Sequence, residues 1–151
     1  MLKTISCGDL RKEHVGQSVT LAGWVHRRRN HGNLIFIDLR DREGIVQVVF
    51  NPETALDAHK SAETLRHEWV VQVMGRVTTR PEGTDNPQLP TGEVEVMAET
   101  ATVLNESRTP PFNVNGESEV EAVLRLKYRY LDMRRSGMRD AMISRHQVVK
   151  C

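Results

Sequence analysis

Residues 23–50, GWVHRRRNHGNLIFIDLRDREGIVQVVF, decide how the rest of the chain is interpreted. Three strand-like segments lie here, joined by short polar turns, and three consecutive arginines end the first segment. One face of the second segment is wholly aliphatic, as expected of a buried strand face: Ile35, Ile37 and Leu39. The opposite face places Phe36 beside Asp38 and Arg40. That mixture suits no core, but it makes a good platform for stacking a flat ligand.

The three segments are predicted to be strands at 18–29, 34–40 and 45–50, with turns at 30–33 and 41–44. Gly23, inside the first strand, predicts a bend or bulge of the kind that a small closed barrel needs. Its neighbour Trp24 is expected to be packed rather than available for stacking.

Outward from this stretch, the pattern predicts a short helical turn at 6–15 capped by Ser6 or Asp9, a helix at 53–68, and strands at 69–79 and 93–104. Residues 80–92 are rich in Pro, Gly, Asn and Thr and are expected to form a long loop. Five strands with a helix between the third and fourth match the OB-fold, a five-stranded Greek-key barrel. The fold class is therefore all-β with a helix.

Three regions are predicted along the chain: an OB-fold domain at 1–104, a linker at 105–118, and a hinge helix followed by the start of a truncated further domain at 119–151. The linker contains Pro110 and Pro111 and few apolar residues. One helix is expected at 119–131, and a second begins near Ser136 and is still running at Cys151. We therefore expect a truncated further domain at this end.

Composition limits the class of protein. The 151 residues are 38% hydrophobic and 27% charged, which indicates a globular chain. No apolar run is long enough to span a membrane and no signal peptide is recognisable, so a cytoplasmic location is expected. The two cysteines have no metal-ligand spacing and are expected to be free thiols. Residues 1–104 carry a net charge of −2 and residues 105–151 of +3, which argues against non-specific nucleic-acid binding.

No catalytic motif is recognisable in the sequence. Asp38 and Asp41 are expected to pair with Arg40, Arg42 or the arginines at 27–29 rather than to act as an acid–base pair. The chain by itself is therefore predicted to be inactive, with no catalytic residue, metal site or cofactor.

Binding is the better-supported function. OB-folds bind single strands on the face built from the second and third strands, where Phe36 and Gln47 are expected to project outward. Phe36 offers a π-face for a base, Gln47 offers a donor and an acceptor, and Arg27, Arg28 and Arg29 suit phosphates or base acceptors. Each feature also has an ordinary structural explanation: a small apolar cluster, a solvated charge run and an exposed polar residue. Their convergence on one face favours binding.

Two stretches carry a family resemblance: residues 23–50, and LRLKYRYLDMRR at 124–135. Together they closely resemble the N-terminal part of bacterial aspartyl-tRNA synthetases, class II enzymes with an OB-fold anticodon-binding domain. The first stretch alone leaves the lysyl and asparaginyl relatives open. The resemblance implies that tRNA(Asp) is the partner, that a homodimeric parent uses ATP and Mg²⁺, and that residues 124–135 form the hinge to its catalytic domain.

The same resemblance implies roles for particular residues. Phe36 would stack on the central anticodon base, Gln47 and Arg29 would read base edges, and Glu95 would act near the third position. The residues implied for the anticodon site are Arg27, Arg28, Arg29, His31, Phe36, Gln47, Arg80, Gly83 and Glu95. Strictly aspartate-specific enzymes usually carry leucine at the position of His31 and a larger residue at that of Gly83. These two residues therefore resemble the non-discriminating form, which also charges tRNA(Asn), although neutral drift of the loops explains them too.

Two other functions are considered. A general single-strand binding OB protein would show broad sequence tolerance and a steep salt dependence, which the charge of −2 over residues 1–104 disfavours. A protein-interaction module is the third possibility.

Overall fold

The computed structural model describes residues 1–114 and 119–150 of the chain. The chain divides into two compact units, Met1–Thr109 and Pro110–Cys151. The first unit contains the whole barrel, and the regular elements described in the second unit are helices. Each unit is described by itself.

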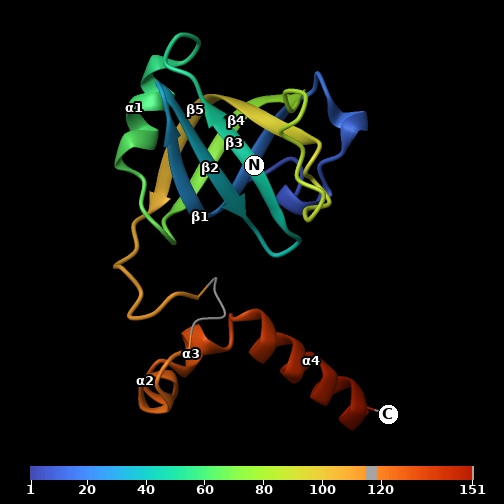
Figure 1. Ribbon diagram of the computed structural model, residues 1–151, viewed down its shortest axis with the longest axis vertical. Helices are drawn as coiled ribbons and strands as arrows, with labels where there is room; N and C mark the ends of the chain where they lie inside the picture. The colour runs from blue at the N-terminus through green and yellow to red at the C-terminus, as the bar shows by residue number, and fades with distance from the viewer. Residues whose placement is uncertain (115–118, 151) are drawn as a thin grey trace. The chain divides into compact units, whose positions relative to one another are not determined.

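The first unit is a closed five-stranded barrel (Figure 1). Its strands are β1 (Ser18–His31), β2 (Leu34–Arg40), β3 (Ile45–Phe50), β4 (Val70–Thr79) and β5 (Val94–Asn105). They close in the order β1-β2-β3-β5-β4, with β3 and β5 parallel and every other pair antiparallel. The OB-fold predicted from the sequence is confirmed, and β2 and β3 have the predicted bounds.

The barrel core follows the two-residue alternation of the strands. On β2 and β3 the inward residues are almost fully buried: Ile35, Ile37, Leu39, Val46, Val48 and Phe50. The inward side of β5 is buried as well and carries Val94, Val96 and Ala98. Burial of these aliphatic and aromatic side chains supplies the main stabilisation of the unit.

The helix between β3 and β4, α1 (Leu56–Thr64), is shorter than the predicted helix at 53–68. Residues before it form turns after Pro52, and Leu65 already has an extended backbone. Ala58, Ala62 and Leu65 enter the barrel core, whereas Leu56, the first residue of α1, is 53% exposed. The predicted helix is therefore confirmed over its middle part, and its buried side carries Ala58 and Ala62.

The first strand is irregular at His26, and the irregularity decides which arginines face outward. The register shifts between Val25 and Arg27. Up to Val25 the inward residues are odd-numbered, but after the bulge Arg28 pairs with the inward Ile37. Arg27 and Arg29 therefore lie on the outer face of the sheet. A bulge inserts one extra residue and so inverts the alternation beyond it.

Gly23 predicted a bend or bulge, but the bulge lies three residues further along the chain. A Cβ at Gly23 would lie 2.4 Å from the backbone oxygen of Arg40 on the neighbouring strand. This glycine is needed because the two backbones approach closely, and not because the strand bends there.

The segment before β1 contains two 3₁₀ turns, Cys7–Asp9 and Lys12–His14, where one helical turn at 6–15 was predicted. Neither begins at a capping side chain of the predicted kind, because Ser6 makes no cap hydrogen bond and Asp9 lies inside the first turn. Gly16, with φ of 88°, follows the second turn and ends the segment.

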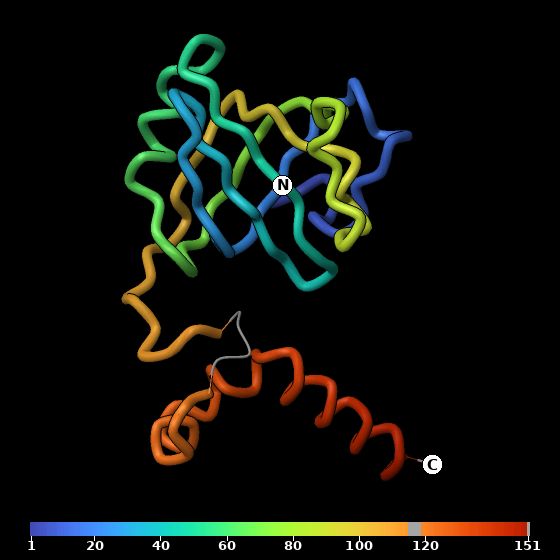
Figure 2. The backbone as a smooth tube through the Cα atoms, in the orientation of Figure 1, coloured from blue at the N-terminus to red at the C-terminus, as the bar shows by residue number. Residues whose placement is uncertain are grey.

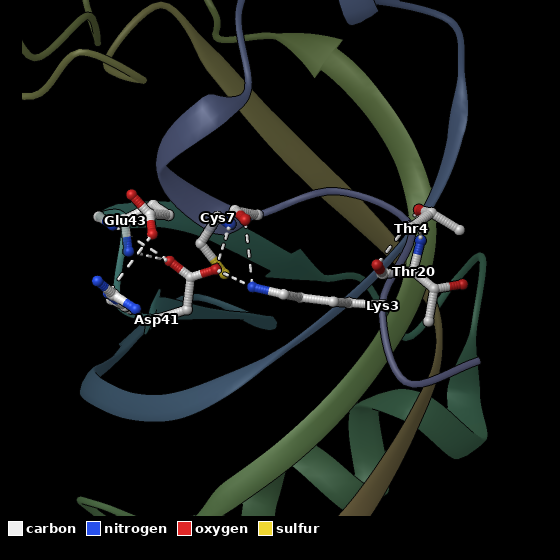
Figure 3. Close-up of polar contacts among 9 residues, drawn as sticks. Lys3, Thr4, Cys7, Thr20, Asp41 and Glu43 are labelled. Atoms are coloured by element: carbon white, nitrogen blue, oxygen red, sulfur yellow. Dashed lines mark hydrogen bonds and ion pairs between the residues drawn. The ribbon is translucent and has the colours of Figure 1, made fainter.

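Asp41 attaches this N-terminal segment to the turn between β2 and β3 (Figure 3). Its Oδ2 accepts from the Cys7 backbone N at 2.8 Å and pairs with Lys3 Nζ at 3.0 Å. Its Oδ1 accepts from the backbone N of Glu43 and Gly44 at 2.9 and 3.1 Å. The predicted arginine partner of Asp41 is thus wrong. Asp38 does pair with an arginine as predicted, with Arg29 Nη2 at 2.7 Å.

The contacts around Asp41 shift its own pKa and the pKa values of Cys7 and Lys3, the last of which is raised by the hydrogen bond to Asp41. Burial would raise the pKa of Asp41, but the hydrogen bonds from Cys7, Lys3, Glu43 and Gly44 outweigh it and lower that pKa from 3.8. Burial and the neighbouring carboxylate raise the pKa of the Cys7 thiol to about 12. Cys7 is a buried, protonated thiol and Cys151 lies outside the described residues.

The second unit contains α2 (Ala122–Lys127), α3 (Arg129–Asp132) and α4 (Ser136–Lys150). The predicted single helix at 119–131 is broken at Tyr128, whose φ and ψ of −112° and 44° are not helical. Asp132 is buried and pairs with Arg125 Nε at 2.9 Å, which ties α2 to α3. The start of α4 at Ser136 agrees with the prediction, and its expected continuation at Cys151 lies outside the described residues, as do residues 115–118 of the predicted linker. No described helix is long and apolar enough to cross a membrane.

Candidate nucleic-acid interface

The outer face of β1, β2, β3 and β5 is ordered in rows across the strands. The pairing registers place Arg29 beside Phe36, Phe36 beside Val49, and Val49 beside Met97. The next row consists of Arg27, Asp38, Gln47 and Glu95. The apolar side chains of Phe36, Val49 and Met97 therefore lie directly beside a row of polar side chains.

A chain of hydrogen bonds fixes the polar row. Arg29 Nη2 donates to Asp38 Oδ1 at 2.7 Å and to Gln47 Oε1 at 3.2 Å. Gln47 Nε2 in turn donates to Glu95 Oε2 at 2.8 Å. Because a guanidinium donates and a carboxylate accepts, the Gln47 amide has one stable orientation between them. This order pre-arranges donors and acceptors at known positions.

Glu95 is 7% exposed although it lies on the outer face of the barrel. Arg80, at the start of the 80–92 loop, lines the same cleft and donates from Nε to the carbonyl of the neighbouring Val94 at 3.2 Å. Burial raises the pKa of Glu95, while the hydrogen bond from Gln47 and the charge of Arg80 oppose that rise. Gln47 is also buried. Gln47 was expected to project outward, and it does lie on the outer face, but its side chain is buried there among the residues that line the cleft.

Together these elements enclose an open cleft of about 690 Å³. Its lining comes from the β1–β2 hairpin, the outer face of the sheet and the loop: Arg29, Asn30, His31, Leu34, Phe36, Gln47, Val49, Asn51, Arg80, Pro81, Thr84, Asn86, Glu95 and Met97. Figure 2 shows the loop in yellow-green on the same side of the barrel as the blue N-terminal segment. Lys12 Nζ pairs there with Glu93 at 2.6 Å, and this ion pair links the N-terminal segment to the end of the loop.

Six of the nine predicted site residues line this one cleft: Arg29, His31, Phe36, Gln47, Arg80 and Glu95. Gly83 lies in the loop between the lining residues Pro81 and Thr84, with φ of 79° and open space around it. Arg27 is exposed on the outer face in the row next to Phe36. Arg28 points elsewhere, since its Nη1 donates to the Glu63 carbonyl of α1 at 2.8 Å.

Sequence reasoning missed several residues of the cleft. Asn86 and Met97 line it but carry no motif of their own. Asp38 was interpreted only as a partner for an arginine, yet it holds the guanidinium that orients Gln47. Trp24 was expected to be packed, but it is 37% exposed on the outer face. The alternation of the first strand places Trp24 opposite the core and could have indicated this exposure. Among the described residues, no cluster of His, Cys, Asp or Glu is arranged to hold a metal ion.

A buried carboxylate in this cleft gives a stability prediction. The pKa of Glu95 is raised in the folded state, so protonation of this carboxyl favours folding. Its contribution to the free energy of unfolding is fully present below pH 4.5 and is lost as pH rises through the folded pKa. Glu95→Gln is therefore expected to raise the free energy of unfolding slightly at pH 7 and to lose this advantage below pH 4.5. Urea denaturation at both pH values measures it. Glu82→Gln, in the exposed part of the same loop, is the control and should change little.

A closed five-stranded barrel with an aromatic ring and ordered polar groups in one outer cleft defines an OB-fold of the nucleic-acid-binding kind. Residues 19–104 match the tRNA anticodon family, described as an OB-fold nucleic acid binding domain, and the chain belongs to that family.

Relatives and solved structures agree with this assignment. The chain is 59% identical over 150 residues to an aspartate–tRNA(Asp/Asn) ligase of Dehalococcoides mccartyi (strain CBDB1), covering 99% of this chain and 25% of that protein. It is 53% identical to the enzyme of the same name from Desulfatibacillum aliphaticivorans, over 100% of this chain and 25% of that protein. Asparaginyl-tRNA synthetase of Pyrococcus horikoshii, solved with asparaginyl-adenylate, superposes with a TM-score of 0.73 at 30% identity, over 89% of this chain and 29% of that one. The chain thus spans about a quarter of the length of these relatives, and the predicted resemblance is confirmed.

Proposed function

We propose that this chain is the anticodon-reading part of an aspartate–tRNA ligase, and that it binds the anticodon loop of tRNA(Asp) in the cleft around Phe36. The whole protein would attach aspartate to tRNA in two ATP-dependent steps through aspartyl-adenylate. ATP, Mg²⁺ and a homodimeric assembly belong to that whole protein. The observation that carries the proposal is the placement of Phe36 against the polar row of Asp38, Gln47 and Glu95.

The chemistry of the cleft suits single-stranded bases. Phe36, Val49 and Met97 form an apolar floor on which a base can stack. Gln47 and Glu95 lie at its edge, where an amide and a carboxylate can accept from an exocyclic amine such as that of cytosine. Arg29 and Arg80 bring positive charge to the cleft walls. Splayed loop bases expose the edges that such groups read, whereas duplex RNA hides them.

We further propose that the site accepts the anticodons of both tRNA(Asp) and tRNA(Asn). These anticodons, GUC and GUU, share their first two letters and differ in the third. His31 lies in the cleft wall and Gly83 lies in the flanking loop with space around it. A smaller, less enclosed wall would discriminate less between the two third letters. The relatives named for both tRNAs support this proposal.

Titration of the 151-residue chain with fluorescently labelled RNA hairpins tests the function. Hairpins with GUC and GUU loops are expected to bind with similar affinity, and a hairpin with an unrelated loop of the same length should bind at least about tenfold more weakly. Equal binding of all three, with a steep dependence on salt, would instead identify a general single-strand binder. Markedly weaker binding of GUU than of GUC would remove the relaxed specificity alone.

A further inference from the structure

A second aromatic residue shares the outer face of the barrel with Phe36. Trp24 on β1 pairs in register with Arg40 on β2, one row beyond Arg27 and Asp38. The indole is 37% exposed, and the Arg40 guanidinium carbon lies 6.0 Å from the ring centroid. Arginine beside an indole forms a cation–π pair and presents a second flat surface next to the ring.

The guanidinium of Arg40 is fixed from behind. Its Nη2 donates to both carboxylate oxygens of Glu68, at 3.0 and 3.1 Å, and its Nη1 lies 3.2 Å from His26 Nδ1. Glu68 is 5% exposed and has a φ of 64°, a left-handed conformation that is unusual for glutamate. Because Glu68 neutralises Arg40, this pair attracts phosphate weakly. A planar ligand that stacks is the chemistry that suits it.

The spacing between Phe36 and the Trp24–Arg40 pair fits an extended strand of nucleic acid. Phe36 and Arg40 are four residues apart on β2, about 13 Å at the usual rise of a strand. Between them Arg27 is exposed on the outer face. OB-folds contact about 4 to 16 nucleotides, more than the few bases that one cleft holds. A nucleic-acid strand with one base stacked on Phe36 therefore has flanking nucleotides that either lie along this face of the barrel or turn away from it.

We propose that Trp24 with Arg40 is a second base-stacking platform, which takes a nucleotide flanking the one on Phe36, and that Arg27 contacts the phosphate between them. The proposal rests on the function proposed above and extends it to the nucleotides next to the anticodon. It gives a role to Arg27, which the cleft does not use.

The protein has two tryptophans, and this allows a direct test. Trp69 packs against the barrel core and donates from Nε1 to the Ser107 carbonyl, so Trp69→Phe leaves Trp24 as the single tryptophan, whose emission is excited selectively at wavelengths that tyrosine does not absorb. Titration of that variant with the GUC hairpin is expected to quench its emission with the same Kd as the anisotropy of the labelled RNA. Trp24→Leu is expected to weaken binding about fivefold or more. Arg27→Gln should reduce the salt slope by about 1.

The matched control is Met74→Ala, which removes an apolar side chain that is 49% exposed on β4. It should leave the affinity unchanged. One outcome would overturn the second platform and leave the proposed function intact. In it, hairpin binding still requires Phe36, but the emission of Trp24 does not change on binding and Trp24→Leu binds with the parent's affinity. Absence of any hairpin binding would overturn both. Circular dichroism checks that Trp24→Leu folds, and the quenching in Trp69→Phe decides the matter if it does not.

Discussion

Phe36→Ala is expected to weaken binding of the GUC hairpin by about 5- to 150-fold, because base–aromatic stacking contributes about 1–3 kcal/mol. Phe36 is partly exposed in the floor of the cleft, beside Val49 and Met97. Its removal takes away the largest flat surface there while leaving the polar row in place. Fluorescence anisotropy of the labelled hairpin, at one fixed salt concentration, measures the change.

Two further variants separate stacking from simple burial. Phe36→Tyr keeps the ring and should bind within about twofold of the parent, whereas Phe36→Leu keeps an apolar side chain without a π-face and should resemble Phe36→Ala. An alanine variant with the parent's affinity would show that no base stacks on this residue. The barrel should remain folded in all three, because Phe36 lies outside the buried core.

Asp41→Ala is expected to lower the free energy of unfolding by about 3 kcal/mol or more. The carboxylate accepts hydrogen bonds from three backbone N–H groups and pairs with Lys3. Leaving a buried donor without an acceptor costs about 1–3 kcal/mol, and the Cys7 amide is buried. Urea denaturation followed by circular dichroism measures the loss.

Asp41→Asn should rescue little of this loss. Each carboxylate oxygen accepts from a different part of the chain, and an asparagine would have to turn its NH₂ group toward one pair of donors. Asp9→Ala, which removes an exposed carboxylate two residues from Cys7, is the matched control and should cost less than about 0.5 kcal/mol. Comparable losses in the two alanine variants would contradict the anchoring role of Asp41.

The pH dependence of the Asp41→Ala effect follows from the lowered pKa of Asp41. The stabilisation is present above the unfolded value of 3.8 and is lost as pH falls through the lower folded value. The difference in unfolding free energy between Asp41→Ala and the parent should therefore be full at pH 7 and shrink below pH 3.8. A difference that stays constant into acid would mean that the charge of Asp41 contributes nothing.

Local patterns predicted a large part of this fold. The bounds of β2 and β3 were correct because period-two alternation and the flanking turn residues are short-range signals. Helix bounds were less accurate: α1 lacks the predicted first turn at 53–55 and ends at Thr64, four residues before the predicted end. The residues of the site were also partly predictable, since Phe36 on the polar side of an otherwise apolar strand is visible in the sequence.

Other features depend on contacts between distant parts of the chain. Gln47 was expected to project outward from the sheet, and it does, but both Gln47 and Glu95 are buried in a cleft that residues of the 80–92 loop also line. Two of the partners of Asp41, Lys3 and Cys7, lie more than thirty residues away in the sequence. Neither contact follows from composition or periodicity, because each depends on where a loop or terminus packs in three dimensions.

The sequence by itself determined the order of five strands and a helix, the inward faces of β2, β3 and β5, and the family to which the barrel belongs. Only the tertiary structure decided which arginines face the cleft. The bulge at His26 turns Arg27 and Arg29 outward and Arg28 toward α1, where unbroken alternation would have done the reverse. The physical reason is that strand alternation has a period of two, so one unpaired residue inverts every side chain beyond it, and only the pairing of β1 with β2 shows where that residue lies.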